Sequence, residues 1–262
     1  MARLSLPDRP GLLRVTAEDG VATIAMDDEA GKNALSHAMV DALGEAFAAV
    51  GRAPNVSAVV LAGLPEYFSS GASEELLVEL VTSQRDAAEV LLPRLLLDCP
   101  LPCIAAMAGH AIGGGFALGM AADIVLLGRE SRYCLNFLDL GFTPGMGTTR
   151  LLEHALSPAL AHELLFSGEA RLGRDFEGRS GVNRVLPRAE VLPRARDLAA
   201  RIADKPRKAV TLLKRTLSIP RRQAFEVART EETLMHTISF AEPEAARLLE
   251  RFTRNPKEQE QR

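Results

Sequence analysis

The sequence predicts an α/β fold, in which a mostly parallel sheet with crossover helices is followed by an all-helical region. Short apolar runs of strand length alternate with segments of helical periodicity over residues 1–190. Small-residue turns that contain glycine follow two of these runs. Over residues 191–262, helical segments follow one another without a strand between them. We therefore expect a β/α core over residues 1–190 and a helical C-terminal region over 191–262.

The N-terminal part is predicted to form a hairpin and then a helix. Residues 12–16 and 21–26 alternate in strand fashion around Asp19 and Gly20, which is typical of a β-hairpin. Ser36 is expected to cap the following helix. The apolar positions of that helix recur at helical spacing: Met39, Leu43, Phe47 and Val50.

The central part contains three short apolar runs that we interpret as buried strands. They cover residues 56–61, 103–107 and 123–127. Residues 113–122, between the last two runs, are rich in glycine and alanine and predict a helix entered through a glycine turn. The C-terminal helices are expected over residues 191–203, 206–217, 221–240 and 244–254. A proline near each start favours this interpretation: Pro193, Pro206, Pro220 and Pro243.

Composition excludes several classes of function. The chain has 31 basic and 34 acidic residues and a net charge of −3, so it has no basic field for nucleic acid or an anionic membrane. No apolar run reaches the length of a membrane span, and the first residues lack an apolar leader segment. Cys99, Cys103 and Cys134 lack metal-site spacing and are interpreted as buried free thiols. We expect a cytoplasmic protein.

Two glycine-containing segments carry the chemical prediction. Residues 67–73 and 109–116 each follow a predicted strand and lead into a helix. Such turns leave backbone N–H groups without partners at a helix N-terminus, where the helix dipole also favours negative charge. Two of them on adjacent strands could direct two N–H groups at one oxygen, as an oxyanion hole does. A dinucleotide or phosphate loop is excluded because neither G-x-G-x-x-G nor Gly-Lys-Ser/Thr is present.

In this order and spacing, several motifs together resemble the crotonase (enoyl-CoA hydratase/isomerase) superfamily. The matching stretches are 32–36, 68–72, 102–115, 122–123, 141–145 and 181–185. The resemblance implies a spiral of β-β-α units with a helical C-terminal region that forms homo-trimers, often paired as hexamers. It also implies that the N–H groups of Ala72 and Gly114 form the oxyanion hole. No cofactor or metal is implied, because the substrate is itself a phosphopantetheine or CoA thioester.

The two acids of the hydratases in this family are missing. Their positions are occupied by Ala117 and Phe137, and neither side chain can transfer a proton. Asp139 is two residues away, a displacement that directs its side chain elsewhere. Hydration by the family's usual route is therefore not expected.

A sub-branch of the superfamily is more similar still. Residues 133–137 and 141–147, with His110 and His236, resemble the decarboxylating crotonases of polyketide β-branching cassettes. The resemblance implies that a 3-methylglutaconyl thioester on an acyl carrier protein loses carbon dioxide, with His236 as a catalytic residue. The lysine of that branch is absent, and Leu80 stands at its expected position. The acyl pocket is expected to be lined by Leu76, Leu80, Ala117, Phe137 and Phe142.

Two alternatives remain open. The first is an enoyl-thioester isomerase, in which His236 moves a proton between the α and γ carbons of the acyl group. The second is a silent crotonase that only binds a carrier protein, although two intact glycine turns argue against it. His236 could also be an ordinary core histidine among Leu234, Met235 and Ile238. The remaining histidines are expected to be structural or on the surface: His37, His110, His154 and His162.

Overall fold

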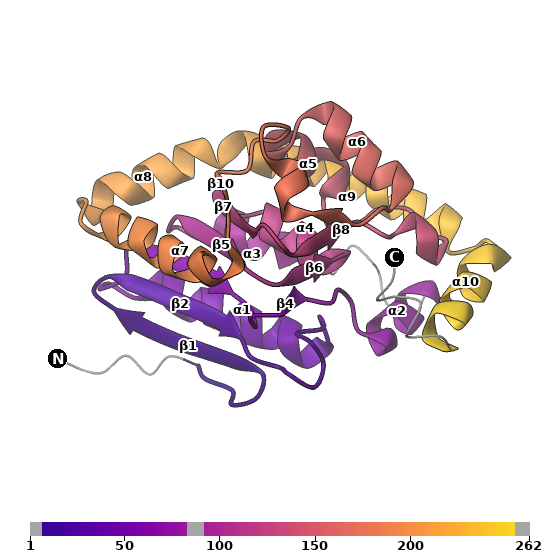
Figure 1. The fold of residues 1–262 in the computed structure, drawn as a ribbon, viewed down its shortest axis with the longest axis horizontal. Helices are drawn as coiled ribbons and strands as arrows, with labels where there is room; N and C mark the ends of the chain where they lie inside the picture. Colours follow the sequence, from indigo (N-terminus) through magenta and orange to yellow (C-terminus); the bar gives the residue numbers. More distant parts are fainter. Residues whose placement is uncertain (1–6, 83–91, 255–262) are drawn as a thin grey trace.

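The computed structural model describes residues 7–82 and 92–254, with side chains described as far as residue 251. Two sheets form its centre (Figure 1). The larger sheet has the order β1-β2-β3-β5-β7-β10 and is parallel except for the β1–β2 hairpin. The smaller sheet has the order β4-β6-β8-β9, and only β9 runs antiparallel to its neighbour.

The strands of the larger sheet are β1 Leu13–Glu18, β2 Val21–Met26, β3 Ala58–Ala62, β5 Cys103–Met107, β7 Ile124–Gly128 and β10 Arg184–Leu186. Those of the smaller sheet are β4 Tyr67–Ser69, β6 His110–Ile112, β8 Arg132–Cys134 and β9 Arg171–Leu172. The first helices are α1 His37–Arg52, α2 Glu74–Val81, α3 Leu92–Asp98, α4 Gly114–Met120, α5 Thr148–Ala155 and α6 Pro158–Ser167. The later ones are α7 Arg188–Ala203, α8 Arg207–Leu217, α9 Ile219–Ser239 and α10 Pro243–Arg254. Short 3-10 turns are η2 Leu138–Leu140 and η3 Gly173–Phe176.

The chain winds as a spiral of β-β-α units, as the resemblance implies. In three successive turns it passes from β3 to β4, from β5 to β6 and from β7 to β8, and so adds one strand to each sheet per turn. Helical segments follow each pair: α2, α4, and η2 with α5. The predicted α/β fold is therefore confirmed, and the helices α2 and α4, which follow the parallel neighbours β4 and β6, begin at the same edge of the smaller sheet.

Several local predictions are confirmed. The hairpin forms with Leu13 opposite Met26, and the Ser36 side chain accepts a hydrogen bond from the N–H of Met39 at the start of α1. All five residues of β3 and all five of β5 are buried, which is why these strands are continuous apolar runs. The three cysteines are buried free thiols.

The chain is helical from Arg188 onward as far as it is described, and the four predicted helices form. The first begins three residues before its predicted start, so Pro193 lies inside α7 rather than near its beginning. α7 packs on the larger sheet through Val191, Ala195 and Ala199, one helical turn apart. The division into a core over 1–190 and an oligomerisation region over 191–262 stays a prediction. Within the described ranges, the structure has no helix long and apolar enough to cross a membrane.

Candidate active site

The two glycine turns lie against each other. β4 and β6 are parallel neighbours, so the turns that follow them leave the same edge of the smaller sheet. Gly71 has a φ of +93°, and a Cβ placed there would lie 3.8 Å from the Gly114 nitrogen and 2.8 Å from the Ile112 carbonyl oxygen. This conformation and this close approach both require glycine.

The N–H groups of Ala72 and Gly114 belong to these turns. Gly114 is the first residue of α4, so its N–H has no acceptor within the helix. Ala72 forms a parallel bridge with Leu35, which is held by Leu35 N–H donating to Gly71 O at 2.7 Å and Ser73 N–H donating to Leu35 O at 3.3 Å. Neither bond uses the N–H of Ala72. The two N–H groups therefore belong to adjoining turns, while their joint contact with one oxygen and their role in catalysis stay predictions.

Asn33 holds the first turn in place. Its side chain is fully buried, and its Nδ2 donates to Tyr67 O at 3.2 Å and Phe68 O at 3.1 Å. In return, Ser69 Oγ donates to Asn33 O at 2.8 Å. Asn33 has a φ of +54°, a conformation that asparagine tolerates better than most residues. The sequence analysis assigned no role to Asn33. The available signal was an asparagine, a residue that tolerates positive φ, in the short link between the hairpin and the capped helix.

The two acid positions of hydratases are apolar and buried in this structure. Ala117 lies on α4, and Phe137 precedes η2. The exposed Asp139 is directed away, because a Cβ at Gly168, just after α6, would lie 2.7 Å from its Oδ2. The expectation that Asp139 points elsewhere is therefore confirmed.

His236 lies in an aromatic group at the end of α9. Its ring stacks on Phe240 at 5.0 Å and meets Phe142 edge-on at 6.4 Å, while Phe142 contacts Phe137 at 6.2 Å between ring centroids. The residue is 8% exposed, and its Nε2 lies 2.8 Å from Thr143 O. A carbonyl oxygen only accepts, so Nε2 carries the hydrogen in this contact.

α2 carries the two remaining predicted pocket residues. Leu76 is buried and Leu80 is half-buried, and the sequence of α2, EELLVELV, contains no cation. α10 packs against both α2 and η2, so the C-terminal helices fold back over this part of the molecule, as expected (Figure 1). The contacts of His236 described above come from Phe142, Thr143 and Phe240. Its predicted proximity to Leu76, Leu80 and Phe137 around an acyl group stays a prediction.

A buried carboxylate that sequence reasoning missed, Glu232, lies one helical turn before His236. It is 3% exposed and accepts hydrogen bonds from Gly147 N–H at 2.7 Å, Thr149 N–H at 3.0 Å and Thr149 Oγ1 at 2.7 Å. Burial raises the pKa of Glu232, and these hydrogen bonds to the charged form act in the opposite direction. A glutamate on a predicted helix is typical of an exposed face, so the sequence pattern carried no signal that this one is buried.

Other polar groups near the sheets have structural roles. His110 accepts a hydrogen bond at Nδ1 from Arg132 N–H at 2.8 Å, which confirms the structural interpretation, and burial lowers its pKa. The Tyr133 hydroxyl donates to Met107 O at 2.6 Å, and burial raises its pKa. His37, Glu75 and Glu79 have ligand atoms within 4.8 Å of one another, and His37 Nε2 lies 2.9 Å from Glu79 Oε2.

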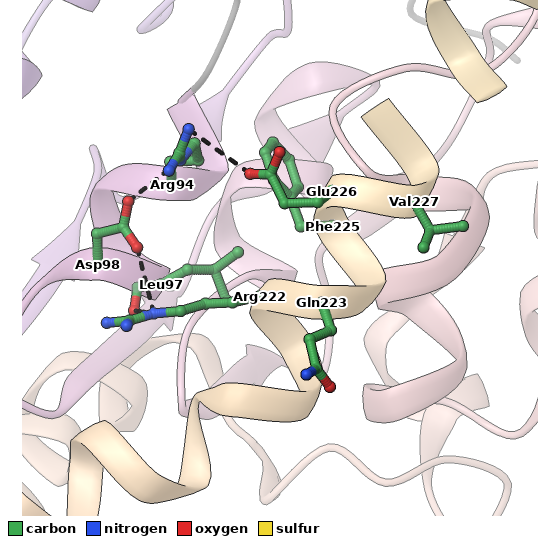
Figure 2. Close-up of a pocket in the computed structure, with 8 residues that line it drawn as sticks. All are labelled: Arg94, Leu97, Asp98, Arg222, Gln223, Phe225, Glu226 and Val227. Atoms are coloured by element: carbon green, nitrogen blue, oxygen red, sulfur yellow. Dashed lines mark hydrogen bonds and ion pairs between the residues drawn. The ribbon is translucent and has the colours of Figure 1, made fainter. Parts of the chain in front are cut away.

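A surface pocket of about 470 Å³ lies between α3 and α9 (Figure 2). It is lined by Arg94, Leu97, Asp98, Arg222, Gln223, Phe225, Glu226 and Val227. Asp98 pairs with Arg94 at 3.1 Å and with Arg222 at 3.2 Å, so these arginines already have carboxylate partners (Figure 2). None of the predicted site residues lines this pocket, and we do not assign the acyl site to it.

The family model and the similar proteins both match most of the length of the chain. The family model for enoyl-CoA hydratase/isomerase matches residues 16–259. The chain is 41% identical over 226 residues to bacillaene synthase decarboxylase PksI from Bacillus subtilis (strain 168), a match that covers 86% of this chain and 91% of that protein.

Solved structures of similar proteins have the same fold. One belongs to a dehydratase/decarboxylase enzyme couple involved in polyketide β-branching, with 39% identity, a TM-score of 0.88, and coverage of 91% of this chain and 98% of that one. The ECH2 decarboxylase domain of CurF from Lyngbya majuscula has 36% identity, a TM-score of 0.85, and coverage of 92% and 99%. With a spiral of β-β-α units, two adjoining glycine turns and matches over almost its whole length, the chain belongs to the enoyl-CoA hydratase/isomerase, or crotonase, family.

Proposed function

We propose that the protein is a decarboxylase of polyketide β-branching, which acts on a 3-methylglutaconyl-type thioester held on an acyl carrier protein. Two observations together carry the proposal. Both glycine turns are present, and both positions that hold acids in hydratases are apolar and buried. Such a site can stabilise a thioester enolate but cannot activate water. The similarity to PksI and to the CurF decarboxylase domain supports the same activity.

The reaction follows from this arrangement. The thioester carbonyl oxygen accepts hydrogen bonds from the N–H groups of Ala72 and Gly114. When the bond to the substrate carboxylate breaks, carbon dioxide leaves and its electron pair enters a dienolate, whose charge rests on that oxygen. Each donor of this type stabilises the transition state by about 2.7–4 kcal/mol. Apolar walls from Ala117 and Phe137 favour the loss of a charged carboxylate as neutral carbon dioxide.

His236 is the proposed proton donor for the dienolate. Its ring carries a hydrogen on Nε2, which donates to Thr143 O in this structure. Nδ1 becomes a second donor when the ring is protonated, so an imidazolium can keep the Thr143 contact and still deliver a proton. The proton goes to the α or the γ carbon and completes the product. No separate cofactor is required, since the substrate carries its own phosphopantetheine or CoA.

A specific observation favours one alternative, double-bond isomerisation. α2 lacks a cation at Leu80, and an isomerase substrate has no carboxylate that would need one. Both reactions pass through the same dienolate. A catalytically silent carrier-binding protein remains the alternative from another class, and it would turn over neither substrate.

Mass spectrometry of carrier-bound substrates distinguishes the decarboxylase, the isomerase and the silent binding protein. With 3-methylglutaconyl carrier protein we expect loss of carbon dioxide that depends on the enzyme, and with crotonyl thioester we expect no efficient addition of water. Migration of the double bond without loss of carbon dioxide would establish the isomerase instead. An unchanged substrate, with carrier binding retained in a pull-down with the purified carrier, would establish the silent binding protein.

We also propose that the protein assembles as a homo-trimer or hexamer through its C-terminal helices. α8 and α9 expose apolar side chains to solvent in the single chain, and a second copy is the occupant that the family implies. These residues are Leu212, Leu213, Leu217, Ile219, Val227, Leu234 and Ile238. The mass in solution from light scattering tests this: a monomer, or unchanged assembly after Leu213→Ser with Leu217→Ser, would contradict it.

A further inference from the structure

We infer that Glu232 is a positioning residue of this site: its carboxylate fastens α9 to the N-terminus of α5 and so determines where His236 lies. This inference rests on the proposed function, because His236 is the group being positioned. The buried residues of α9 are Phe225, Ala228, Glu232 and His236. Their spacing of three, four and four places them on one face of the helix, and this face packs against α5. Glu232 is the one carboxylate in that buried row.

Glu232 supplies the cap that α5 lacks. The residue before α5 is Gly147, which has a φ of +78° and no side chain with which to cap the helix. Both carboxylate oxygens of Glu232 bind there, Oε2 to Gly147 N–H and Oε1 to Thr149 N–H and Oγ1, although Glu232 is 85 residues further along the chain than Gly147. A negative charge at this end of the helix is also favoured by the helix dipole.

A second residue of α9 fixes the same glycine. A Cβ at Gly147 would collide with Cδ2 of Phe225, so the ring packs directly on the backbone. Phe225 and Glu232 are two helical turns apart and hold Gly147 between them. The end of the segment 143–147 is therefore bound to α9 by a ring on one side and a carboxylate on the other.

The same segment touches both halves of the proposed chemistry. At its start, Thr143 O accepts from His236 Nε2, and a Cβ at Gly145 would lie 2.8 Å from Cε1 of His236. Near its end, Met146 lies over the second glycine turn, since a Cβ at Gly114 would be 2.9 Å from the Met146 Sδ. A shift at Gly147 would therefore move the surroundings of His236 and of the Gly114 N–H together.

Glu232→Gln tests the inference with a side chain of the same size. The amide keeps one oxygen but directs an NH₂ group at backbone N–H groups, so at least one of the three hydrogen bonds is lost. We expect kcat to fall about 10- to 100-fold, because misplacement of a catalytic group slows the chemical step. KM for the carrier-bound substrate should be nearly unchanged. The matched control is Glu231→Gln, the adjacent residue, which pairs on the surface with Arg150 at 2.9 Å and should leave kcat unchanged.

A double-mutant cycle separates positioning from simple stability. If Glu232 acts mainly through His236, Glu232→Gln should cost much less activity in a His236→Ala background than in the wild type, and the remaining loss reports the effect on the Gly114 turn. Thr149→Val, which removes only the hydroxyl bond, is the milder second variant and should lower kcat by a smaller factor. Equal losses from Glu232→Gln in both backgrounds, or wild-type kcat in the folded variant, would overturn the inference.

A crystal structure of Glu232→Gln gives a readout that does not depend on the reaction. The His236 ring should leave its 2.8 Å contact with Thr143 O. If the wild type does not decarboxylate the carrier-bound substrate, the proposed function fails. The position of the His236 ring in the variant still tests the positioning role independently. An unmoved ring, together with unchanged segment 143–147, would overturn the positioning role.

Discussion

The two halves of the candidate site are built in different ways. The glycine turns at Gly71 and Gly113 follow adjacent parallel strands, and the groups they present are backbone N–H. His236 reaches the site from the C-terminal region through contacts with residues about 90 positions earlier, such as Thr143, which is 93 positions away. Backbone donors survive most side-chain changes, whereas the histidine depends on tertiary packing. The enolate-stabilising half should therefore be robust and the proton-transfer half sensitive to substitution.

The largest effect is expected from His236→Ala. Loss of a general acid typically lowers the rate about 10²–10⁴-fold. The measurement is kcat for loss of carbon dioxide from carrier-bound 3-methylglutaconyl thioester. The control is His154→Ala, on the exposed part of α5. Decarboxylation within a few-fold of wild type would contradict the assignment and leave the oxyanion hole with most of the catalysis.

Filling the first glycine turn should have the next largest effect. In Gly71→Ala the new Cβ meets Ile112 O at 2.8 Å in a backbone with φ of +93°, so the turn must move and the Ala72 N–H with it. We expect kcat to fall by about 10²–10³-fold. Gly178→Ala is the matched control, because φ is also positive, at +70°, but nothing lies within 4 Å of the new Cβ. Equal activity of the two variants would show that the first turn takes no part in catalysis.

Introducing the missing cation should sharpen the choice between decarboxylase and isomerase. Leu80→Lys places an ammonium group on α2, where a substrate carboxylate could accept a charge-assisted hydrogen bond. Such a bond, at about 1.5 kcal/mol, corresponds to roughly a tenfold lower KM for the substrate that carries the carboxylate. Val78→Lys, on the exposed side of α2, is the control. A lower KM for crotonyl thioester as well would mean that the lysine acts without regard to the carboxylate.

The smallest expected effect is on stability as pH changes. Burial raises the pKa of Glu232 in the folded protein above its ordinary value, so the folded state holds this proton more tightly than the unfolded chain does. The stabilising contribution is therefore complete below the unfolded pKa and is lost as pH rises through the folded pKa. Thermal unfolding from pH 4 upward should show Tm of the wild type falling relative to Glu232→Gln. A difference in Tm that does not change with pH would contradict the raised pKa.

Local pattern was sufficient for much of the fold. β3 and β5 could be predicted because every residue of each is buried, which makes them continuous apolar runs. α1 could be predicted from Ser36 and its apolar row. The smaller sheet could not, because β4, β6 and β8 have three residues each and pair with strands tens of residues away, so they leave no periodic signal.

By itself, the sequence determined the glycine turns, the apolar residues at the acid positions, the continuous apolar strands of the larger sheet and the C-terminal helices. These features are local, since they depend on residue type and on neighbours within a few positions. Only the tertiary structure decided that Asn33 holds the first turn, that Asp139 points away and that Glu232 caps α5 from α9. A glutamate on a helix indicates an exposed face in any sequence pattern. Whether it is buried depends on which helix end packs against it, and here that end lies 85 positions earlier in the chain.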